Sequence, residues 1–301
     1  MLKKAIRKII ITTFIVFIVL TIYLIPTKDK KDNKVYNYID TRDISVYLVN
    51  SYDQLTKVDF KMPSSKIENV IESIINKLTI SNDATIPRKF KQVIPSNVKL
   101  NKSKIEDNIV YLDFSSEFLN IPKDSIEMIV ESIAYSIFEL DNINGISIYV
   151  NEENIKTKYD IPEIITKEYG INKRTDIKSF NDVSKVTIFY IDNEDNNNYY
   201  VPITKYVNDN REKIKIIIDE LSSNYIYESN LISLLNKNSK LLDYEIKNDS
   251  IILDFNNSIF LEQNGVLEEI VYSLVANYDV NEVIFKVEGK DFSKKSIKNV
   301  E

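Results

Sequence analysis

The sequence contains no histidine and no cysteine. Without histidine, the chain lacks the side chain that most often acts as a general base near neutral pH and most often ligates metals. Without cysteine, thiol catalysis, disulfide bonds, cysteine-ligated zinc sites and a lipid-modified N-terminal cysteine are all excluded. Carboxylates, a serine–lysine pair and tyrosine remain as candidates for chemistry.

Glycine is also scarce, with four residues in 301. These are Gly145, Gly170, Gly265 and Gly289, and no two lie within a short loop. A phosphate-cradling loop needs several closely spaced glycines, so no nucleotide-binding motif is present. We therefore expect no nucleotide cofactor.

Charge is divided unevenly along the chain. The first eight residues carry four basic side chains and no acidic one, and beyond them 45 acidic residues face 35 basic ones, a formal charge of −10. Nucleic-acid binding depends largely on neutralising phosphates, so this acidic surplus argues against a nucleic-acid partner.

The longest hydrophobic run is Ile9–Ile25, which directly follows the basic N-terminus. At about 1.5 Å per residue it spans most of a bilayer core of roughly 30 Å. A cleaved signal peptide is the alternative, but no small-x-small cleavage site follows the run. We predict an uncleaved single-pass anchor and stalk over residues 1–35, with the N-terminus in the cytoplasm and the large C-terminal region outside.

The C-terminal half repeats the first half. Leu112-Asp113-Phe114 recurs 141 positions later as Leu253-Asp254-Phe255, and each triplet ends an apolar stretch that follows a polar turn, Asp107-Asn108 or Asn248-Asp249. Hairpin patterns lie upstream of each triplet, around 44–49 and 186–191. The period is too long for a solenoid repeat and indicates two copies of one domain.

Helical periodicity completes each copy. Apolar residues at helical spacing begin at Ile67 and at Ile214, and a second amphipathic helix is expected around Ile129–Ile137 and around 270–274. Each copy therefore reads hairpin, helix, hairpin, helix, strand. We predict two α+β domains, each a small antiparallel or mixed sheet with two helices on one face. The predicted ranges are 42–152 for the first domain, 153–183 for a semi-ordered linker with a short helix at 162–167, 184–290 for the second domain, and 291–301 for a frayed tail.

The strongest chemical candidates are carboxylate pairs, Asp113 with Glu117 and Asp254 with Glu262. Two carboxylates at a suitable separation can hydrolyse glycosides. An aspartate that ends a strand more often caps a turn by accepting backbone N–H groups. Its recurrence in both copies favours this shared structural role, so we predict no catalytic residue.

Two further features have both a functional and a structural reading. The segment Asp192–Asn198 is dense in oxygen ligands, but it lacks the glycine and the distal glutamate of an EF-hand, which favours a solvated hairpin tip over a calcium site. The 19 tyrosines could contact glycans or proteins. Most of them, such as Tyr47, Tyr149 and Tyr190 in strands and Tyr135 and Tyr272 on helices, are expected to be buried or half-buried.

The aligned residues resemble the GerM domain, a sporulation and spore germination module of Gram-positive spore formers. The resemblance covers about four fifths of the chain and rests on the helix Ile67–Leu78, Ile94-Pro95, the strand Val110–Phe114 and their second-copy counterparts. The second copy has Lys240-Leu241 in place of the Ile-Pro pair. Members of this family are typically lipoproteins, whereas here the apolar anchor would replace the lipid.

The resemblance implies a non-catalytic membrane protein that helps an envelope complex assemble outside the cytoplasm. Its partners would be the membrane, through Ile9–Ile25, and other envelope or sporulation proteins. Two alternatives stay open: a peptidoglycan-binding protein and a carboxylate-dependent glycan hydrolase. No metal or other cofactor is expected, and the sequence leaves the binding residues, the partners and the oligomeric state unknown.

Overall fold

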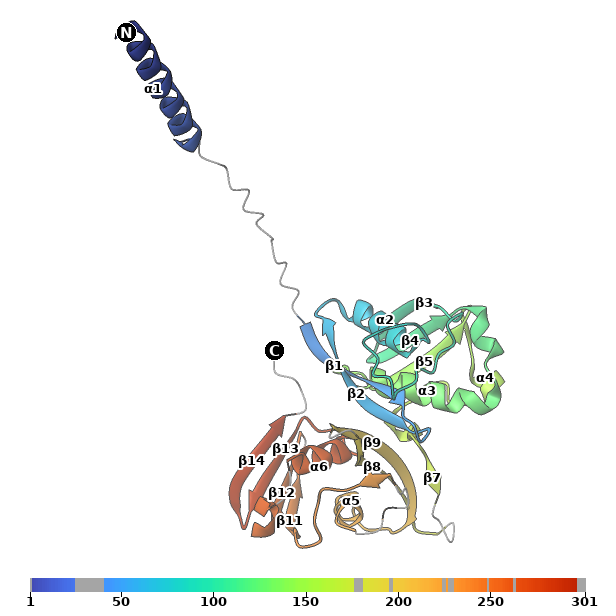
Figure 1. The fold of residues 1–301 in the computed structure, drawn as a ribbon. Helices are drawn as coiled ribbons and strands as arrows, with labels where there is room; N and C mark the ends of the chain where they lie inside the picture. The colour runs from blue at the N-terminus through green and yellow to red at the C-terminus, as the bar shows by residue number, and fades with distance from the viewer. Residues whose placement is uncertain are drawn as a thin grey trace. The chain divides into compact units, whose positions relative to one another are not determined.

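The computed structural model describes residues 2–24, 41–175, 181–194, 197–223, 226, 230–247, 249–261 and 264–296 (Figure 1). The chain divides into two compact units, Met1–Ile39 and Asp40–Glu301. The predicted stalk up to residue 35 lies largely outside the described residues.

The first unit contains the helix α1 (Leu2–Leu24), which covers the predicted apolar segment except Ile25, a residue outside the described part. Its stretch Lys3–Ile22 is long and apolar enough to cross a membrane once. The threonine hydroxyls are satisfied within the helix: Thr13 Oγ1 donates to the Ile9 carbonyl at 2.8 Å and Thr21 Oγ1 to the Ile18 carbonyl at 2.8 Å. Such internal bonding suits a helix surrounded by lipid, where water cannot serve as a partner.

The second unit has the predicted order hairpin, helix, hairpin, helix, strand in both copies, so the α+β fold is confirmed. The elements of the first copy are β1 (Thr41–Val49), β2 (Leu55–Pro63), α2 (Ile67–Leu78), β3 (Leu100–Glu106), β4 (Ile109–Phe114), η1 (Ser116–Asn120), α3 (Lys123–Ile137), β5 (Gly145–Val150) and β6 (Glu153–Asn154). Those of the second copy are β8 (Val183–Glu194), β9 (Asn197–Asn208), α5 (Lys213–Leu221), β10 (Leu231–Ile232), β11 (Leu241–Ile246), β12 (Ser250–Phe255), η3 (Asn257–Leu261), α6 (Val266–Val275), β13 (Glu282–Val287) and β14 (Lys290–Ser296).

The strands form three sheets instead of one per copy. Two four-stranded mixed sheets have the orders β3-β4-β5-β6 and β11-β12-β13-β14, and in each the two central strands are parallel because a helix connects them. The first hairpins of both copies join in one six-stranded sheet, in which five strands have the order β1-β2-β9-β8-β10 and the sixth, the short β7 (Arg174–Thr175), pairs with β9. The hairpins can join because β2 pairs antiparallel with β9, at Lys57 and Tyr200.

Each copy has its own hydrophobic core. In β4, Val110, Leu112 and Phe114 are buried while Tyr111 and Asp113 on the other face are only half-buried, so this sheet has one wetter face. The strand β1 has no such alternation, since all its residues from Ile44 to Val49 are buried. Strands covered on both faces lose the two-residue pattern that periodicity detects.

Two-residue turns with positive φ close the hairpins. Asp107 and Asn108 join β3 to β4, with φ of 51° and 62°, and Glu288 and Gly289 join β13 to β14, with φ of 49° and 80°. This is the conformation that matches the twist of paired strands. The prediction of a frayed tail from Asp291 was therefore wrong for residues 291–296, which form β14; residues 297–301 lie outside the described part.

The predicted linker is ordered as far as Thr175 and contains α4 (Lys156–Tyr159) and η2 (Lys167–Tyr169). The expected helix at 162–167 does not form. Ile165 is extended instead, because its N–H and carbonyl both bond to the backbone of Ile146 in β5, each at 2.8 Å. Residues 176–180 lie outside the described part.

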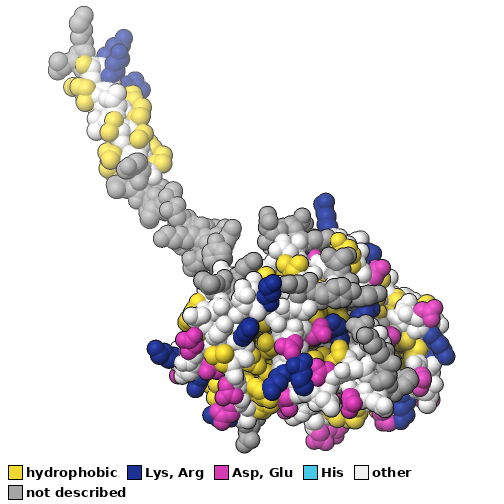
Figure 2. All heavy atoms as spheres, turned by 90° about the horizontal axis from the view of Figure 1, so that it is seen from below, with side chains coloured by type: hydrophobic (Ala, Val, Ile, Leu, Met, Phe, Trp, Pro, Cys, Tyr) yellow, Lys and Arg dark blue, Asp and Glu magenta, His cyan; other side chains and the backbone are white. Residues whose placement is uncertain are grey.

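Figure 2 shows one face of the second unit, on which acidic and basic side chains are interspersed with small hydrophobic patches.

Candidate functional site

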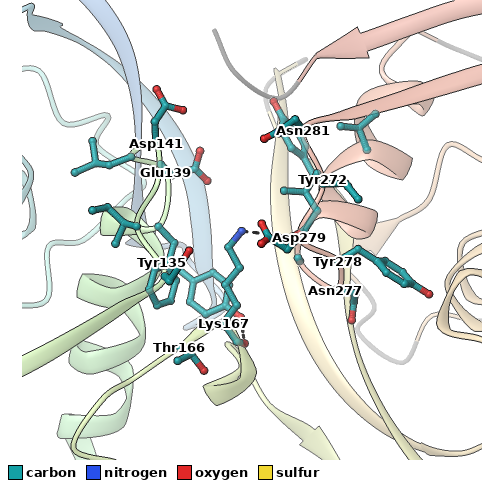
Figure 3. Close-up of a pocket in the computed structure, with 18 of the residues that line it drawn as sticks. Tyr135, Glu139, Asp141, Thr166, Lys167, Tyr272, Asn277, Tyr278, Asp279 and Asn281 are labelled. Atoms are coloured by element: carbon teal, nitrogen blue, oxygen red, sulfur yellow. Dashed lines mark hydrogen bonds between the residues drawn. The ribbon is translucent and has the colours of Figure 1, made fainter. Parts of the chain in front are cut away.

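A cleft of about 840 Å³ lies between the two copies (Figure 3). Its walls are the loops that follow α3 and α6, at 138–144 and 276–281, together with linker residues 166–168. In Figure 3 the side chains of the two loops face each other across the opening. Clefts at the junction of two domains are common binding sites in proteins.

Equivalent backbone bonds hold the two loops. The Asn144 N–H donates to the Asn108 carbonyl at 2.8 Å, and the Asn281 N–H donates to the Asp249 carbonyl at 2.9 Å. Each bond links the loop after the second helix to the turn before the central strand of the same copy. The cleft is therefore built from matching parts of the repeat.

Side chains of α3 and α6 bond the backbone of the neighbouring strands. The Ser136 hydroxyl accepts from the Tyr47 N–H at 2.9 Å, and the Ser132 hydroxyl donates to the Tyr47 carbonyl at 2.7 Å. In the second copy, Ser273 accepts from the Phe189 N–H at 2.9 Å. These bonds satisfy strand groups that would otherwise be unpaired and fix Tyr47 and Phe189 in the cleft lining.

The centre of the cleft contains an ion pair. Glu139 accepts from the Tyr47 hydroxyl at 2.8 Å and from the Lys57 ammonium at 2.6 Å. The Lys57 side chain is 7% exposed, and its ammonium also lies 4.4 Å from the ring centre of Tyr272 in the second copy. Burial and the neighbouring Glu139 charge raise the pKa of Tyr47 well above its usual value. The ion pair thus lies within the first copy, and the cation–π contact of Lys57 with Tyr272 joins it to the second.

A second lysine, Lys167, reaches into the same space from the linker. Its ammonium lies 3.5 Å from the Val275 carbonyl. Burial lowers the pKa of Lys167, although the charges of Glu139 and Asp279 act in the opposite direction. Burial also raises the pKa of Tyr135 and Tyr272, so both phenols are neutral at physiological pH.

Asn172 joins the copies behind the cleft. Its side chain accepts from the Leu55 N–H at 2.9 Å and donates to the carbonyls of Leu55 and Pro202, each at 2.8 Å. Its backbone N–H donates to Glu131, which is buried in α3 and also pairs with Lys173 at 3.0 Å. Burial raises the pKa of Glu131. One linker residue therefore bonds β2, β9 and α3 at once.

The carboxylates singled out in the sequence lie away from this cleft. Asp113 accepts from the Glu152 N–H at 2.9 Å, and Asp254 accepts from the Gly289 N–H at 2.9 and 3.0 Å. Each aspartate thus holds a turn, as expected. The turn is the one that follows the adjacent parallel strand, not the one that follows the aspartate in sequence. Glu117 is half-buried, and Glu262 lies outside the described residues.

The possible calcium segment 192–198 is described only in part, since residues 195 and 196 lie outside the described ranges. Asp192 is buried and accepts from Asn50 of the first copy at 3.0 Å. Across the residues that are described, no group of three or more acidic side chains is placed to hold a metal ion.

Among the described residues, the tyrosines are mostly buried or half-buried, as expected. Tyr47, Tyr135 and Tyr190 are buried, and Tyr149 and Tyr272 are half-buried. Sequence reasoning missed the cleft itself, because its central residues Lys57, Glu139 and Lys167 belong to three separate segments with no motif among them. Their only sequence signal is a charged residue in an otherwise apolar stretch.

Chemically, this cleft offers neutral phenols, amide groups and one desolvated amine, and its central carboxylate is already paired with Lys57. Such an arrangement suits binding through hydrogen bonds and charge.

Comparison with known proteins adds a family. The family model described as "Germane: Sporulation and spore germination" matches residues 38–156 and 187–292. The spore germination protein GerM of Bacillus subtilis (strain 168) is 27% identical over 263 residues, covering 81% of this chain and 71% of that protein. The epidermin biosynthesis protein EpiB of Staphylococcus epidermidis is 24% identical over 227 residues, covering 72% of this chain but 22% of that protein.

Among solved structures, the tandem GerMN domains of the sporulation protein GerM from Bacillus subtilis match with a TM-score of 0.73 at 26% identity. The match covers 83% of this chain and 92% of that one. The similarity therefore extends over both copies together, including the way they are joined.

Proposed function

Because this chain belongs to the Germane family of sporulation and spore germination proteins, we propose that it is a non-catalytic, membrane-anchored assembly module for envelope complexes. α1 holds it in the membrane, and the two domains, in the ranges 42–152 and 184–290, act outside the cytoplasm. Contacts with other envelope or sporulation proteins carry its function.

The observation that carries this proposal is the rigid junction between the domains. A shared sheet, the side-chain bonds of Asn172 and the cation–π contact of Lys57 with Tyr272 connect them at three separate places. Two freely linked domains would present variable surfaces, whereas a fixed pair presents one extended surface to a partner. Rigid presentation lowers the entropy lost when a complex assembles.

The length of the N-terminal tail supports the proposed orientation. Four basic residues precede the apolar run and four lysines follow it, at 28, 30, 31 and 34, but the preceding segment is only eight residues long and is the easier one to keep in the cytoplasm. The chain beyond it is acidic and lacks cysteine, so its folding outside the cytoplasm requires no disulfide bond.

The proposal is tested by affinity purification of the tagged full-length chain, with α1 intact, from sporulating and from vegetative cells of its host. We expect envelope or sporulation proteins to be recovered from sporulating cells. The Asn172→Ala variant, which loosens the junction, should recover less of them at equal abundance. Recovery of the same partners in both states, or none in sporulating cells, would refute a sporulation-specific assembly role.

A further inference from the structure

A pair of tyrosines occupies the outer face of the sheet β3-β4-β5-β6, away from the first core. Tyr111 on β4 and Tyr149 on β5 have ring centres 6.2 Å apart, and their planes are inclined by 42°. Both side chains are half-exposed. Within the described part of the chain, neither phenol oxygen has a hydrogen-bond partner, so both are available to a ligand.

Cationic and polar groups border the two rings. Lys104 lies 4.7 Å from the ring centre of Tyr111 and pairs with Glu106 at 2.9 Å. Lys102, two residues earlier on the same strand face, has no ion-pair partner among the described residues. The nearby Asp113 is engaged by the Glu152 N–H. The ammonium of Lys102 thus makes no salt bridge among the described residues, and Asp113 is its cross-strand neighbour.

The second copy shows that the fold does not require these tyrosines. Asp113 pairs with Tyr149 in the first copy, and Asp254 pairs with Lys286 at the same register in the second. Two residues before each aspartate stand Tyr111 and Ile252. The aromatic pair is therefore specific to the first copy, since the second copy forms the same sheet with isoleucine and lysine at these positions.

We propose that this face, formed by Tyr111, Tyr149, Lys102 and Lys104, binds the glycan strand of peptidoglycan. A pyranose ring has an apolar face that stacks on an aromatic ring, and its hydroxyl and acetamido groups can bond the free phenols. Peptidoglycan also carries carboxylates, which can pair with the ammonium of Lys102 because it makes no salt bridge among the described residues. A protein partner would be favoured by aliphatic anchors around the rings, whereas the neighbours here are lysines and carboxylates.

This inference rests on the proposed location outside the cytoplasm, whereas the binding test uses purified protein and does not depend on that location. Purified full-length protein in detergent micelles is sedimented with purified peptidoglycan sacculi over a range of protein concentrations. The double variant Tyr111→Ile, Tyr149→Lys carries the residues of the second copy and should retain the fold, checked by its thermal midpoint. We expect its apparent affinity to fall by about tenfold, as the loss of two stacking contacts predicts.

Three further variants separate the contributions. Tyr52→Ile removes another tyrosine, 53% exposed in the β1–β2 turn, and should bind like the original chain. Tyr111→Phe keeps the stacking ring and should lose little, while Lys102→Gln should weaken binding at low salt and remove part of the salt dependence.

Failure of the original chain to sediment with sacculi would overturn the inference, as would equal sedimentation of the double variant. Neither result would bear on the assembly role, which is measured by partners recovered from cells. If no partner proteins are recovered from cells but the purified chain still sediments with sacculi, only the assembly role is refuted.

Discussion

Replacement of Asn172 by alanine tests the junction between the domains. The side chain makes three hydrogen bonds, two with Leu55 of β2 and one with Pro202 of β9. Asn172 also has a φ of 48°, in the left-handed region that asparagine tolerates better than alanine. The variant therefore loses the link between two strands and gains backbone strain.

The cost is the sum of these effects. Each hydrogen bond contributes about 1 kcal/mol net, and alanine in the left-handed region costs about 1 kcal/mol. The free energy of unfolding should thus fall by about 4 kcal/mol, of which about 3 comes from the junction. Because Leu55 loses the acceptor of its N–H, its amide hydrogen should also exchange faster with solvent.

The assay is urea unfolding of the full-length chain in detergent micelles, followed by near-ultraviolet circular dichroism of the tyrosines. Asn142→Ala is the matched control, because Asn142 is exposed, has a φ of 59° and shares only the backbone strain. Its expected cost is about 1 kcal/mol. Equal losses in the two variants would refute the claim that Asn172 holds the domains together.

Three other substitutions test individual contacts. Glu139→Gln leaves the ammonium of Lys57 buried without its counter-ion and should destabilise the fold by about 3 kcal/mol, measured by urea unfolding. Asp83→Asn removes the negative charge that pairs with Lys77; in the original chain, hydrogen bonds from Lys77 and Thr85 lower the pKa of Asp83 to about 2. The pKa of Asp83 is lower in the folded state than in the unfolded state, so its ionised form stabilises the fold. At pH 7 the original chain should be more stable than the variant by about 1 kcal/mol, a figure reduced for solvent screening. This difference should vanish as the pH falls from about 4 to 2 and Asp83 becomes protonated. Asp254→Ala should cost about 1 kcal/mol by freeing the β13–β14 turn, seen as faster amide exchange at Gly289.

Each of these has an outcome that contradicts it. Asp43→Asn is the control for Glu139→Gln, because it breaks the ion pair of Lys61 with Asp43, whose side chains are 75% and 64% exposed, and should lower the free energy of unfolding by less than about 1 kcal/mol. A loss as large as that of Glu139→Gln would show that burial of the ion pair does not cause the larger cost. If the original chain and the Asp83→Asn variant still differ in their free energy of unfolding at pH 2, ionisation of Asp83 is not the cause of the difference. Unchanged exchange at Gly289 would show that Asp254 does not hold its turn.

The elements within each copy follow from local signals in the sequence. Apolar residues at helical spacing indicate α2 and α3, and the repeated Leu-Asp-Phe triplet marks the end of β4 and of β12. These features depend on neighbours in the chain, which periodicity detects. The same local reasoning assigned Asp113 and Asp254 a turn-holding role.

The arrangement of the copies depends on distant contacts and was not predictable in this way. The pairing of β2 with β9 joins segments more than 130 residues apart, and Asn172 stands in a polar segment that resembles a linker. The strand β14 was missed because its lysines and serines form an edge strand without an apolar pattern. The cleft residues come from three separate segments, and only the contacts of Lys57 with Tyr272 and of Lys167 with Val275 reach the second copy.

The central claim is that the two domains work outside the cytoplasm, and the absence of cysteine makes a direct measurement possible. A single cysteine is introduced in the full-length chain by Tyr52→Cys, in the second unit, or by Lys4→Cys, in the first turn of α1. Intact cells are then treated with a membrane-impermeant maleimide. Labelling at position 52 but not at position 4 is the predicted result, whereas labelling at position 4 alone would place the domains in the cytoplasm and contradict the account.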